Sequence, residues 1–373
     1  MKKVLIIDRV ISQYRGEFYN QLKSELKKKG TELLLIYGKG TKKDQQKKDK
    51  IDISWGHLVN GKTIWIMGLD LYWQTSFLLL KEADLVIVQQ ANKLLFNYYL
   101  MLFRKIHGVK LAFCGHGKNM QSPEYSLANQ IKKKLLTQVD WWFPYTEGVK
   151  RYLIKNKFNK DRISVIENAI DTRALLSQYQ AISNAQTDSI KEELGIQSEN
   201  IGLYCGGIYK EKRIDFLIQA CDRIKSFIPD FHFILIGAGN ESEKVVVAQK
   251  KRNWMHYLGP KFNEEKVPYF KLASVFLMPG LVGLAILDTF AMETPLITTQ
   301  YPYHSPEIEY LAPGQNGVMT KNNINSFAEG VVKVLKNPEK LQHLKKGCQS
   351  SALLYTNEKM VKNFSEGIVK CLG

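Results

Sequence analysis

The sequence predicts an α/β protein made of two doubly wound domains, each built on a parallel sheet. Short apolar runs alternate with helical stretches along most of the 373 residues, which is the pattern of strand–helix–strand units. The alternation occurs in two series, separated by a polar stretch at residues 168–200 that is rich in Ser, Gln and Asn. A chain of this length exceeds one ordinary core, so two domains are expected.

In the first series the candidate strands are short, bounded by charge or glycine, and rich in Val, Ile and aromatic residues. They are Val4–Ile7, Glu32–Tyr37, Asp84–Val88, Lys110–Cys114, Trp141–Tyr145 and Ile163–Ile166. The helices between them are expected at Gly16–Lys29, Lys93–His107, Ser126–Thr137 and Gly148–Lys157. We therefore assign residues 1–170 to an N-terminal Rossmann-like domain.

Residues 171–198 are expected to connect the domains, and residues 199–356 to form a second Rossmann-like domain. Its candidate strands are Ile201–Cys205, Phe233–Ile236, Met255–Leu258, Val275–Met278 and Pro295–Thr299. Helices are expected to begin near Ile214, Ser242, Lys266 and Leu284, and then to occupy Ile324–Leu335, Pro338–Tyr355 and Asn357–Leu372. Ligands of such sheets bind at the carboxyl ends of the strands.

Positive charge is concentrated in the first half. Residues 1–170 hold 30 of the 53 Lys and Arg residues but only 15 of the 36 Asp and Glu residues, with lysine runs at Lys27–Lys29, Lys42–Lys50 and Lys132–Lys134. This asymmetry indicates a polyanionic partner. If the partner is an anionic membrane surface, each lysine near it would contribute about 1 kcal/mol to the binding free energy. A lysine-rich solvated surface is the alternative. Nucleic acid is disfavoured, because the sequence holds no recognised nucleic-acid module.

Cysteine usage and hydropathy favour a cytoplasmic protein. The five cysteines are scattered without disulfide spacing, which is typical of reduced thiols. No segment reaches about 18 uncharged apolar residues, and Leu94–Phe103 is expected to be a buried helix, with a membrane-touching helix face as the alternative. The sequence has no Asp-x-Asp pair and no His or Cys ligand spacing, so we expect neither a metal nor another cofactor.

Three strands of the second half end in glycine-bearing turns that precede helices, within residues 203–220, 233–240 and 279–298. Unpaired backbone N–H groups at such helix starts, together with the helix dipole, favour an anionic diphosphate. Lys212 and Arg213 follow the first turn with the matching charge, although a basic helix start on the surface is the alternative. The pattern indicates a nucleotide-linked substrate.

These motifs resemble the retaining glycosyltransferases of the GT-B fold, specifically family 4, whose members use sugar nucleotides. The resemblance covers nearly the whole chain and is strongest over residues 201–317. It implies two Rossmann-like domains facing a cleft, with the last helix, residues 357–372, packing back on the first domain. It also implies a nucleoside-diphosphate sugar donor in the second domain, UDP more often than GDP, and an acceptor in the first.

The first glycine turn carries the resemblance to the donor diphosphate site. Gly206-Gly207-Ile208 and Lys212 match the family's Gly-Arg-Leu turn and the lysine that contacts the diphosphate. Gly207 stands in place of the family arginine, and Arg213 is the candidate to supply the missing charge. The resemblance therefore assigns Gly206, Gly207, Lys212 and Arg213 to donor binding.

The third turn resembles the family's Glu-x7-Glu motif. Asp288 matches the second Glu, which contacts the nucleotide ribose, whereas Gly280 replaces the first, which touches the donor sugar. Gly283 and Leu284 fit the turn whose amides receive phosphate or sugar oxygens. The remaining donor-binding candidates are Gly237 and Gly239, beside the donor in this family, and Lys261 and Phe262, in the loop against the base.

In the first domain, His116 follows a strand between two glycines, where the family often has a histidine near the donor sugar. A satisfied structural histidine is the alternative. Tyr14 and Arg15 lie in the loop after the first strand, where the family meets its acceptor, and Gly115 and Lys118 are the other acceptor-binding candidates. The candidate catalytic residues are His116, Lys212 and Asp288.

The sequence thus predicts a metal-independent, retaining glycosyltransferase at the inner face of the cell membrane. Its acceptor would be a hydroxyl of a lipid-linked or surface glycan, such as capsule or lipopolysaccharide. Two alternatives stay open: a sugar-nucleotide epimerase of the same fold, and a catalytically degenerate, nucleotide-binding partner of a transferase. The absent Glu and Arg favour the degenerate partner, whereas Lys212, Asp288 and His116 favour the enzyme.

Overall fold

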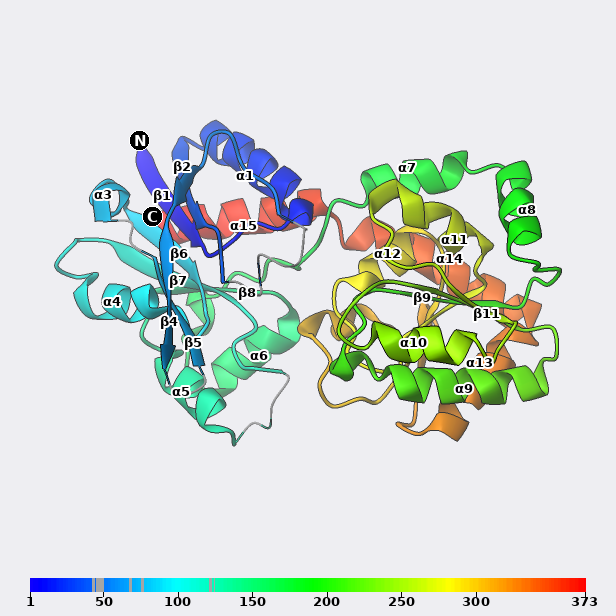
Figure 1. Cartoon of the computed structure of the whole chain (residues 1–373). Helices are drawn as coiled ribbons and strands as arrows, with labels where there is room; N and C mark the ends of the chain where they lie inside the picture. Colours follow the sequence, from blue (N-terminus) through cyan, green and yellow to red (C-terminus); the bar gives the residue numbers. More distant parts are fainter. Residues whose placement is uncertain (42–43, 45–49, 67–68, 75–76, 121–122, 124) are drawn as a thin grey trace. The chain divides into compact units, whose positions relative to one another are not determined.

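The computed structural model of the chain describes residues 1–41, 44, 50–66, 69–74, 77–120, 123 and 125–373 (Figure 1). The chain divides into two units. The first unit comprises Met1–Asp171 together with Thr356–Gly373, and the second comprises Thr172–Tyr355. The lysine run at residues 42–50 lies mostly outside the described residues.

The first unit is built on a six-stranded parallel sheet in the order β3-β2-β1-β6-β7-β8. Its strands are β1 (Lys2–Asp8), β2 (Thr31–Gly38), β3 (His57–Val59), β6 (Leu85–Gln89), β7 (Lys110–Gly115) and β8 (Trp141–Pro144). The last five residues of β1 are buried, as expected for a central strand covered on both faces. The strand order reverses between β1 and β6, which is the point where such sheets bind ligands.

Helices cover this sheet on both faces (Figure 1). They are α1 (Gly16–Lys28), α3 (Phe77–Leu80), α4 (Leu95–Phe103), α5 (Leu127–Leu135), α6 (Glu147–Lys155) and α15 (Asn357–Leu372), with the 3₁₀ turns η1 (Gln13–Arg15) and η2 (Lys160–Arg162). The last helix, α15, packs against α1 and β8. Its Phe364 ring lies 5.8 Å from the Phe18 ring and 4.5 Å from the Phe143 ring, measured between centroids. A helix from the far end of the sequence thus completes the core of the first unit.

The first unit differs from the sequence-based expectation in several places. The antiparallel hairpin β4 (Gly61–Ile66) and β5 (Leu69–Gln74) was not expected, and neither was the edge strand β3. The first two residues of β3, His57 and Leu58, are exposed, so no buried apolar run marks this strand in the sequence. Ile163–Ile166, which we expected to be a strand, makes one isolated bridge from Ile163 to Trp142 and continues no ladder.

The second unit repeats the same strand order, as β11-β10-β9-β12-β13-β14, again wholly parallel. Its strands are β9 (Ile201–Cys205), β10 (His232–Ile236), β11 (Met255–Tyr257), β12 (Val275–Leu277), β13 (Leu296–Thr299) and β14 (Gly317–Thr320). The order reverses between β9 and β12, so the carboxyl ends of these strands form the second candidate ligand edge. Strand β14 was not expected.

The helices of the second unit are α7 (Arg173–Ala181), α8 (Asn184–Glu193), α9 (Ile214–Phe227), α10 (Ser242–Gln249), α11 (Val267–Leu272), α12 (Ala285–Ala291), α13 (Ile324–Leu335) and α14 (Pro338–Leu354). Three 3₁₀ turns accompany them: η3 (Lys210–Lys212), η4 (Asn263–Lys266) and η5 (Pro306–Tyr310).

The segment 171–198, which we expected to be a connection, instead carries α7 and α8, and both pack on α11. A capping box between Ser183 and Gln186 starts α8, so these two polar residues begin a helix rather than form part of a linker.

The core of each unit lies between its sheet and its helices, where large aromatic side chains are fully buried. They include Phe113, Trp142 and Phe143 in the first unit, and Phe233, Phe270 and Phe276 in the second. Within the described part of the chain, no helix has both the length and the apolar character needed to cross a bilayer. The apolar segment at residues 94–103 corresponds to α4, which buries Phe96 and Leu100.

Candidate functional site

The glycine turns after β9 and β10 pack directly against each other. The Ile208 N–H donates to the carbonyl of Ala238 at 2.9 Å. A Cβ atom on Gly237 would lie 1.9 Å from the Gly206 carbonyl oxygen, and one on Gly239 would lie 2.0 Å from the Ile208 oxygen. Only glycine permits this approach of two backbones. The two glycines are therefore explained by contact between the turns.

Three glycine amides of these turns are engaged inside the protein, which corrects the expectation that they are unpaired. The Gly206 N–H donates to the Ile236 carbonyl at 3.0 Å, and the Gly237 N–H donates to the Gly259 carbonyl at 2.8 Å. The Gly239 N–H donates to the Ser242 hydroxyl at 2.9 Å. These three groups shape the carboxyl edge of the second sheet rather than offering hydrogen bonds to a diphosphate.

The Lys212 side chain contacts the third glycine turn, which precedes α12. Its side chain is buried, and its ammonium group donates to the Leu281 carbonyl at 2.6 Å and lies 3.5 Å from the Met278 sulfur. Burial lowers the pKa of Lys212 to about 8. The structure thus brings Lys212 from the first turn to residues 279–283 of the third, at the same edge of the sheet.

His304, which sequence reasoning missed, holds the same turn from another side. The Val282 N–H donates to Nδ1 of His304 at 3.0 Å, so Nε2 carries the proton and donates to the Thr299 carbonyl at 2.9 Å. Burial lowers the pKa of His304, which agrees with a neutral ring. A single histidine in a Tyr-rich loop carries no motif, so only the fold reveals this role.

Gly280, at the position of the family's first Glu, faces the backbone of η3. A Cβ atom there would lie 2.4 Å from the Glu211 oxygen and 2.6 Å from the Lys212 carbonyl carbon. The position therefore has no room for any side chain. Gly283 and Leu284 are half-buried at the start of α12, with Leu284 as the residue before its first turn.

Asp288 on α12 forms an ion pair with Lys266 of η4. The Lys266 nitrogen donates to Oδ2 of Asp288 at 2.6 Å, and the two side chains are only 15% and 14% exposed. The other oxygen, Oδ1, is buried and has no hydrogen-bond partner among the described residues. Burial opposes the charge of Lys266, but Asp288 and Cys205 together raise its pKa.

Burial raises the pKa of the Cys205 thiol to about 12. The charges of Lys266 and Asp288 act in opposite directions on the pKa of this thiol, which belongs to the last residue of β9. Lys266 was predicted only as a helix start, because nothing in its local sequence links it to Asp288.

The other donor-binding candidates lie around this edge. Arg213 has a left-handed backbone, with φ of +58°, and its guanidinium donates to the Asn322 side chain and lies 5.2 Å from the Tyr301 ring. The Lys261 ammonium lies 5.3 Å from the Tyr269 ring, and the neighbouring Phe262 is 55% exposed. Phe262 therefore offers an aromatic face to solvent.

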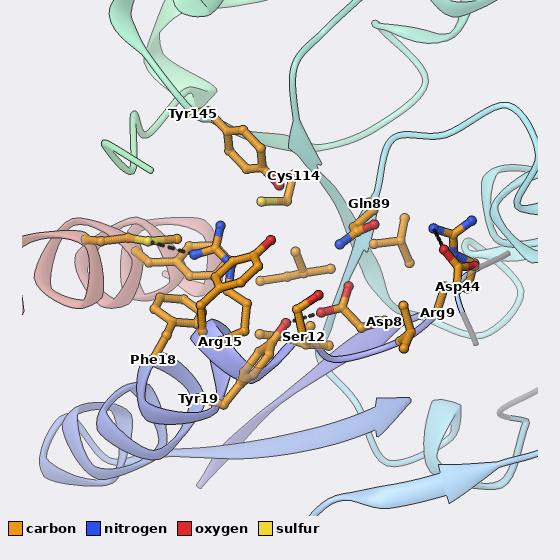
Figure 2. A pocket seen from close by; sticks show the side chains of 17 residues that line it. Asp8, Arg9, Ser12, Arg15, Phe18, Tyr19, Asp44, Gln89, Cys114 and Tyr145 are labelled. Carbon is orange, nitrogen blue, oxygen red and sulfur yellow. Dashed lines mark hydrogen bonds and ion pairs between the residues drawn. The ribbon is translucent and has the colours of Figure 1, made fainter. Parts of the chain in front are cut away.

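The first unit has a cavity of about 240 Å³ at the carboxyl ends of its central strands (Figure 2). Its polar lining comprises Asp8, Arg9, Ser12, Tyr14, Arg15, Tyr19, Asp44, Gln89, Cys114 and Tyr145. The buried Asp8 carboxylate accepts a hydrogen bond from the Tyr19 hydroxyl, and Arg9 pairs with Asp44 at 3.1 Å. The cavity includes two acceptor-binding candidates, Tyr14 and Arg15, but neither Gly115 nor Lys118.

Arg15 lines the cavity, and its guanidinium is bonded to neighbouring residues of the first unit. It donates to the Asn168 side chain, to the Ala169 carbonyl at 3.1 Å, and to the Met360 sulfur at 3.3 Å. These partners lie in the segment that leads to Asp171 and in α15. Arg15 therefore anchors both segments to the loop after β1.

His116 is half-buried just beyond β7. Its ring lies edge-on to Tyr145, with 4.8 Å between centroids, and Tyr145 lines the cavity. Gly115 and Gly117 flank it with φ of +141° and +69°, a region that favours glycine. The Lys118 ammonium instead lies 5.2 Å from the Tyr152 ring of α6, away from the cavity lining.

No group of three His, Cys, Asp or Glu side chains that could hold a metal ion occurs among the described residues.

Two family models match the chain, one in each half. The model described as Glycosyltransferase Family 4 matches residues 18–174, and the model described as Glycosyl transferases group 1 matches residues 199–337. The chain belongs to the family 4 glycosyltransferases. The predicted fold class is confirmed, because the chain has two Rossmann-like α/β units and its structural neighbours are GT-B glycosyltransferases.

Two of these neighbours are solved structures that match over nearly their whole length. Anabaena HepE in complex with UDP has a TM-score of 0.71 at 14% identity, covering 99% of this chain and 100% of that one. A glycosyltransferase from Rickettsia africae has a TM-score of 0.69 at 15% identity, covering 99% and 98%. At these identities the likeness shows the fold alone.

Curated relatives match in part. The alpha-monoglucosyldiacylglycerol synthase of Acholeplasma laidlawii is 26% identical over 244 residues, which is 64% of this chain and 60% of that protein. The GtfA subunit of the UDP-N-acetylglucosamine–peptide N-acetylglucosaminyltransferase of Streptococcus agalactiae is 26% identical over 175 residues, 44% of this chain and 34% of that protein. The chain thus spans less than two thirds of the length of the curated relatives it matches.

Proposed function

We propose that this family 4 protein is a retaining glycosyltransferase that moves a sugar from a nucleoside-diphosphate donor to a hydroxyl of a lipid-linked or surface glycan. UDP is the favoured nucleotide, ahead of GDP. The observation that supports this most is the carboxyl edge of the second sheet, where Lys212, Arg213 and the Asp288–Lys266 pair gather around packed glycine turns. The named activity and UDP ligand of similar proteins agree with it.

In this proposal Asp288 binds the ribose. Its buried Oδ1 has no partner among the described residues, so it can accept a hydrogen bond from a ribose hydroxyl. Lys266 pairs with the carboxylate at 2.6 Å and supplies its countercharge. A buried acceptor of this kind rejects a ligand that has no hydroxyl to donate.

Lys212 and Arg213 stabilise the departing diphosphate. The Lys212 ammonium has three donors, of which the Leu281 carbonyl and the Met278 sulfur take two, and with a pKa of about 8 it is charged at neutral pH. As the bond from the sugar C1 to the diphosphate oxygen breaks, the diphosphate keeps the electron pair. The acceptor oxygen bonds to C1 on the same face and gives up its proton to the leaving diphosphate. Fixed positive charge beside the diphosphate favours this step.

The proposed reaction needs no metal, because the two cationic side chains supply the countercharge that a divalent ion would otherwise provide. We further propose that the basic first unit works at the inner face of the cell membrane. Leu102 and Ile106, at the end of α4 and just after it, are 75% and 78% exposed, and Lys105 lies between them. Such a combination suits an anionic lipid surface.

Thermal unfolding with UDP, GDP, ADP and their sugar conjugates in EDTA tests the donor assignment. A nucleotide present at a hundred times its dissociation constant stabilises by about 2.7 kcal/mol. We expect UDP to stabilise the protein and one UDP-sugar to stabilise it further. Equal melting temperatures with every nucleotide would contradict the proposal.

A second candidate is a nucleotide-binding partner of a transferase without activity of its own. Gly280 favours it, since that position excludes the acid that touches the donor sugar in related enzymes. Nucleotide binding without release of free UDP, on any acceptor or on water, would support this candidate over the enzyme.

A further inference from the structure

We propose that His304 is a positioning residue for the proposed reaction, and that it holds the Lys212 ammonium in place through the peptide group that joins Leu281 to Val282. The inference rests on the proposed transferase function and deepens it, because it identifies what fixes the charge that stabilises the departing diphosphate. His304 is only 5% exposed, so it acts through its neighbours rather than on a ligand.

One peptide group of the third glycine turn is bonded at both ends. Its carbonyl, which belongs to Leu281, accepts a hydrogen bond from the Lys212 ammonium at 2.6 Å. Its N–H, which belongs to Val282, donates to Nδ1 of His304 at 3.0 Å. Because a peptide group is planar and rigid, a rotation at one end carries the other end with it. The His304 ring and the Lys212 ammonium are therefore linked through a single rigid group.

The neighbouring peptide groups are anchored independently of His304. The Leu281 N–H donates to the Glu211 carbonyl at 2.9 Å, and the Val282 carbonyl accepts from the Ser305 N–H at 2.9 Å. These bonds belong to the peptide groups before and after the one that His304 holds. Loss of the His304 ring is therefore expected to release the middle peptide group rather than the whole turn.

The His304 ring is itself fixed in the neutral form that this role requires. Its Nε2–H donates to the Thr299 carbonyl at 2.9 Å, which leaves Nδ1 as an acceptor. Burial lowers the pKa of His304, and the charges of Lys212 and Arg213 lower it further, whereas the bond to Thr299 opposes the fall. A further cation beside Lys212 and Arg213 is thus disfavoured, and the ring stays an acceptor at neutral pH.

The two hydrogen bonds of this peptide group strengthen each other. Donation from the Val282 N–H to His304 increases the negative charge on the Leu281 oxygen, which then attracts the Lys212 ammonium more strongly. The other acceptor of Lys212 among the described residues is the Met278 sulfur at 3.5 Å, and a thioether is a weak acceptor. The carbonyl that His304 polarises therefore sets where the ammonium lies.

UDP affinity, measured by calorimetry on the full chain, tests whether His304 acts through Lys212. His304→Leu should weaken UDP binding roughly fivefold or more when Lys212 is present, and by less than about twofold in a Lys212→Met background. His304→Gln should restore most of the affinity, because its amide can accept from Val282 and donate to Thr299. Unchanged affinity in His304→Leu, or an equal loss in both backgrounds, would overturn the proposal.

Hydrogen exchange of the ligand-free protein, followed by mass spectrometry, tests the peptide group directly. At one pH, the segment that contains Val282 should exchange roughly tenfold faster in His304→Leu, and at close to the wild-type rate in His304→Gln. An unchanged rate in His304→Leu would also overturn the proposal. If this variant does not fold, His304→Phe takes its place in both experiments, since it keeps an aromatic ring beside Tyr301, whose centroid lies 5.7 Å from that of His304.

His256→Leu is the matched control. It removes another histidine of the second unit, one whose ring nitrogen lies 3.0 Å from that of His232 at the beginning of β10. Neither UDP affinity nor the exchange of Val282 should change in this variant. Absence of UDP binding from the wild type would contradict the transferase function itself, whereas the exchange of Val282 would still decide whether His304 holds the peptide group.

Discussion

The Lys212 ammonium donates a hydrogen bond of 2.6 Å to the carbonyl of Leu281, 69 residues further along the chain. The bond ties η3 to the turn before α12, and the Leu281 N–H returns a bond to the Glu211 carbonyl at 2.9 Å. Lys212 therefore stabilises the fold at the carboxyl edge of the second sheet, where the donor is proposed to bind, and also supplies positive charge there.

Replacing Lys212 with Met should impair both properties. We expect a loss of about 1–3 kcal/mol in the free energy of unfolding, since the Leu281 carbonyl would be left buried and unpaired. UDP affinity, measured by calorimetry, should fall at least tenfold. Lys210→Met, an exposed change of the same charge on η3, should alter neither quantity by much. UDP affinity equal to that of the wild type in Lys212→Met would remove Lys212 from the donor site.

The Asp288–Lys266 pair predicts a strong asymmetry between single and double variants. Asp288→Leu leaves the Lys266 ammonium largely buried without its partner, and we expect it to cost about 3 kcal/mol of stability in urea denaturation. Combining it with Lys266→Met should restore most of this loss. Additive losses in the double variant would show that the two side chains are not coupled.

The tight packing of Gly280 predicts that the family's first Glu cannot be restored at this position. Gly280→Ala should destabilise the second unit by about 1–3 kcal/mol, because its Cβ would collide with the η3 backbone. Gly283→Ala is the control, since a Cβ there would only approach the Ser305 hydroxyl at 3.4 Å. A Gly280→Glu variant as stable as the wild type would refute this account of the missing acid.

His232 and His256 predict that stability falls in mild acid. Their ring nitrogens, Nδ1 and Nε2, lie 3.0 Å apart on neighbouring strands, and burial lowers the pKa of His256 to about 4. The unfolded state, with a pKa near 6.5, binds protons first, so this contribution is complete above pH 6.5 and is lost as the pH falls toward 4. We expect about 1 kcal/mol less stability at pH 5 than at pH 7.5, after allowing for solvent screening. His256→Gln should flatten the pH dependence of the unfolding free energy, and an unchanged slope would contradict it.

Sequence reasoning located elements where a local pattern was strong. The helices α9, α13 and α15 begin at the predicted residues, and β9 has both predicted ends, because each is a clear apolar run or amphipathic stretch. Strand β14 was missed, since its four residues include a glycine and a threonine and form no apolar run.

The candidate site shows the same limit. Sequence motifs identified Asp288 and Lys212 as candidates, and their roles as donor ligands remain predictions. No motif identified Lys266 or His304, because their roles depend on partners about twenty residues away that only the folded sheet brings together. The buried Asp8 was overlooked for another reason: a carboxylate at the end of an apolar run looks like the polar boundary of a strand.

Helix α15 sets the order in which the two units can be completed during synthesis. The second unit is continuous in sequence, from Thr172 to Tyr355, and can close as soon as it leaves the ribosome. The first unit is synthesised earlier but must wait for α15, leaving Phe18 and Phe143 without the ring of Phe364 until translation has passed the whole of its neighbour. The half of the protein that is made first is therefore the half that is finished last.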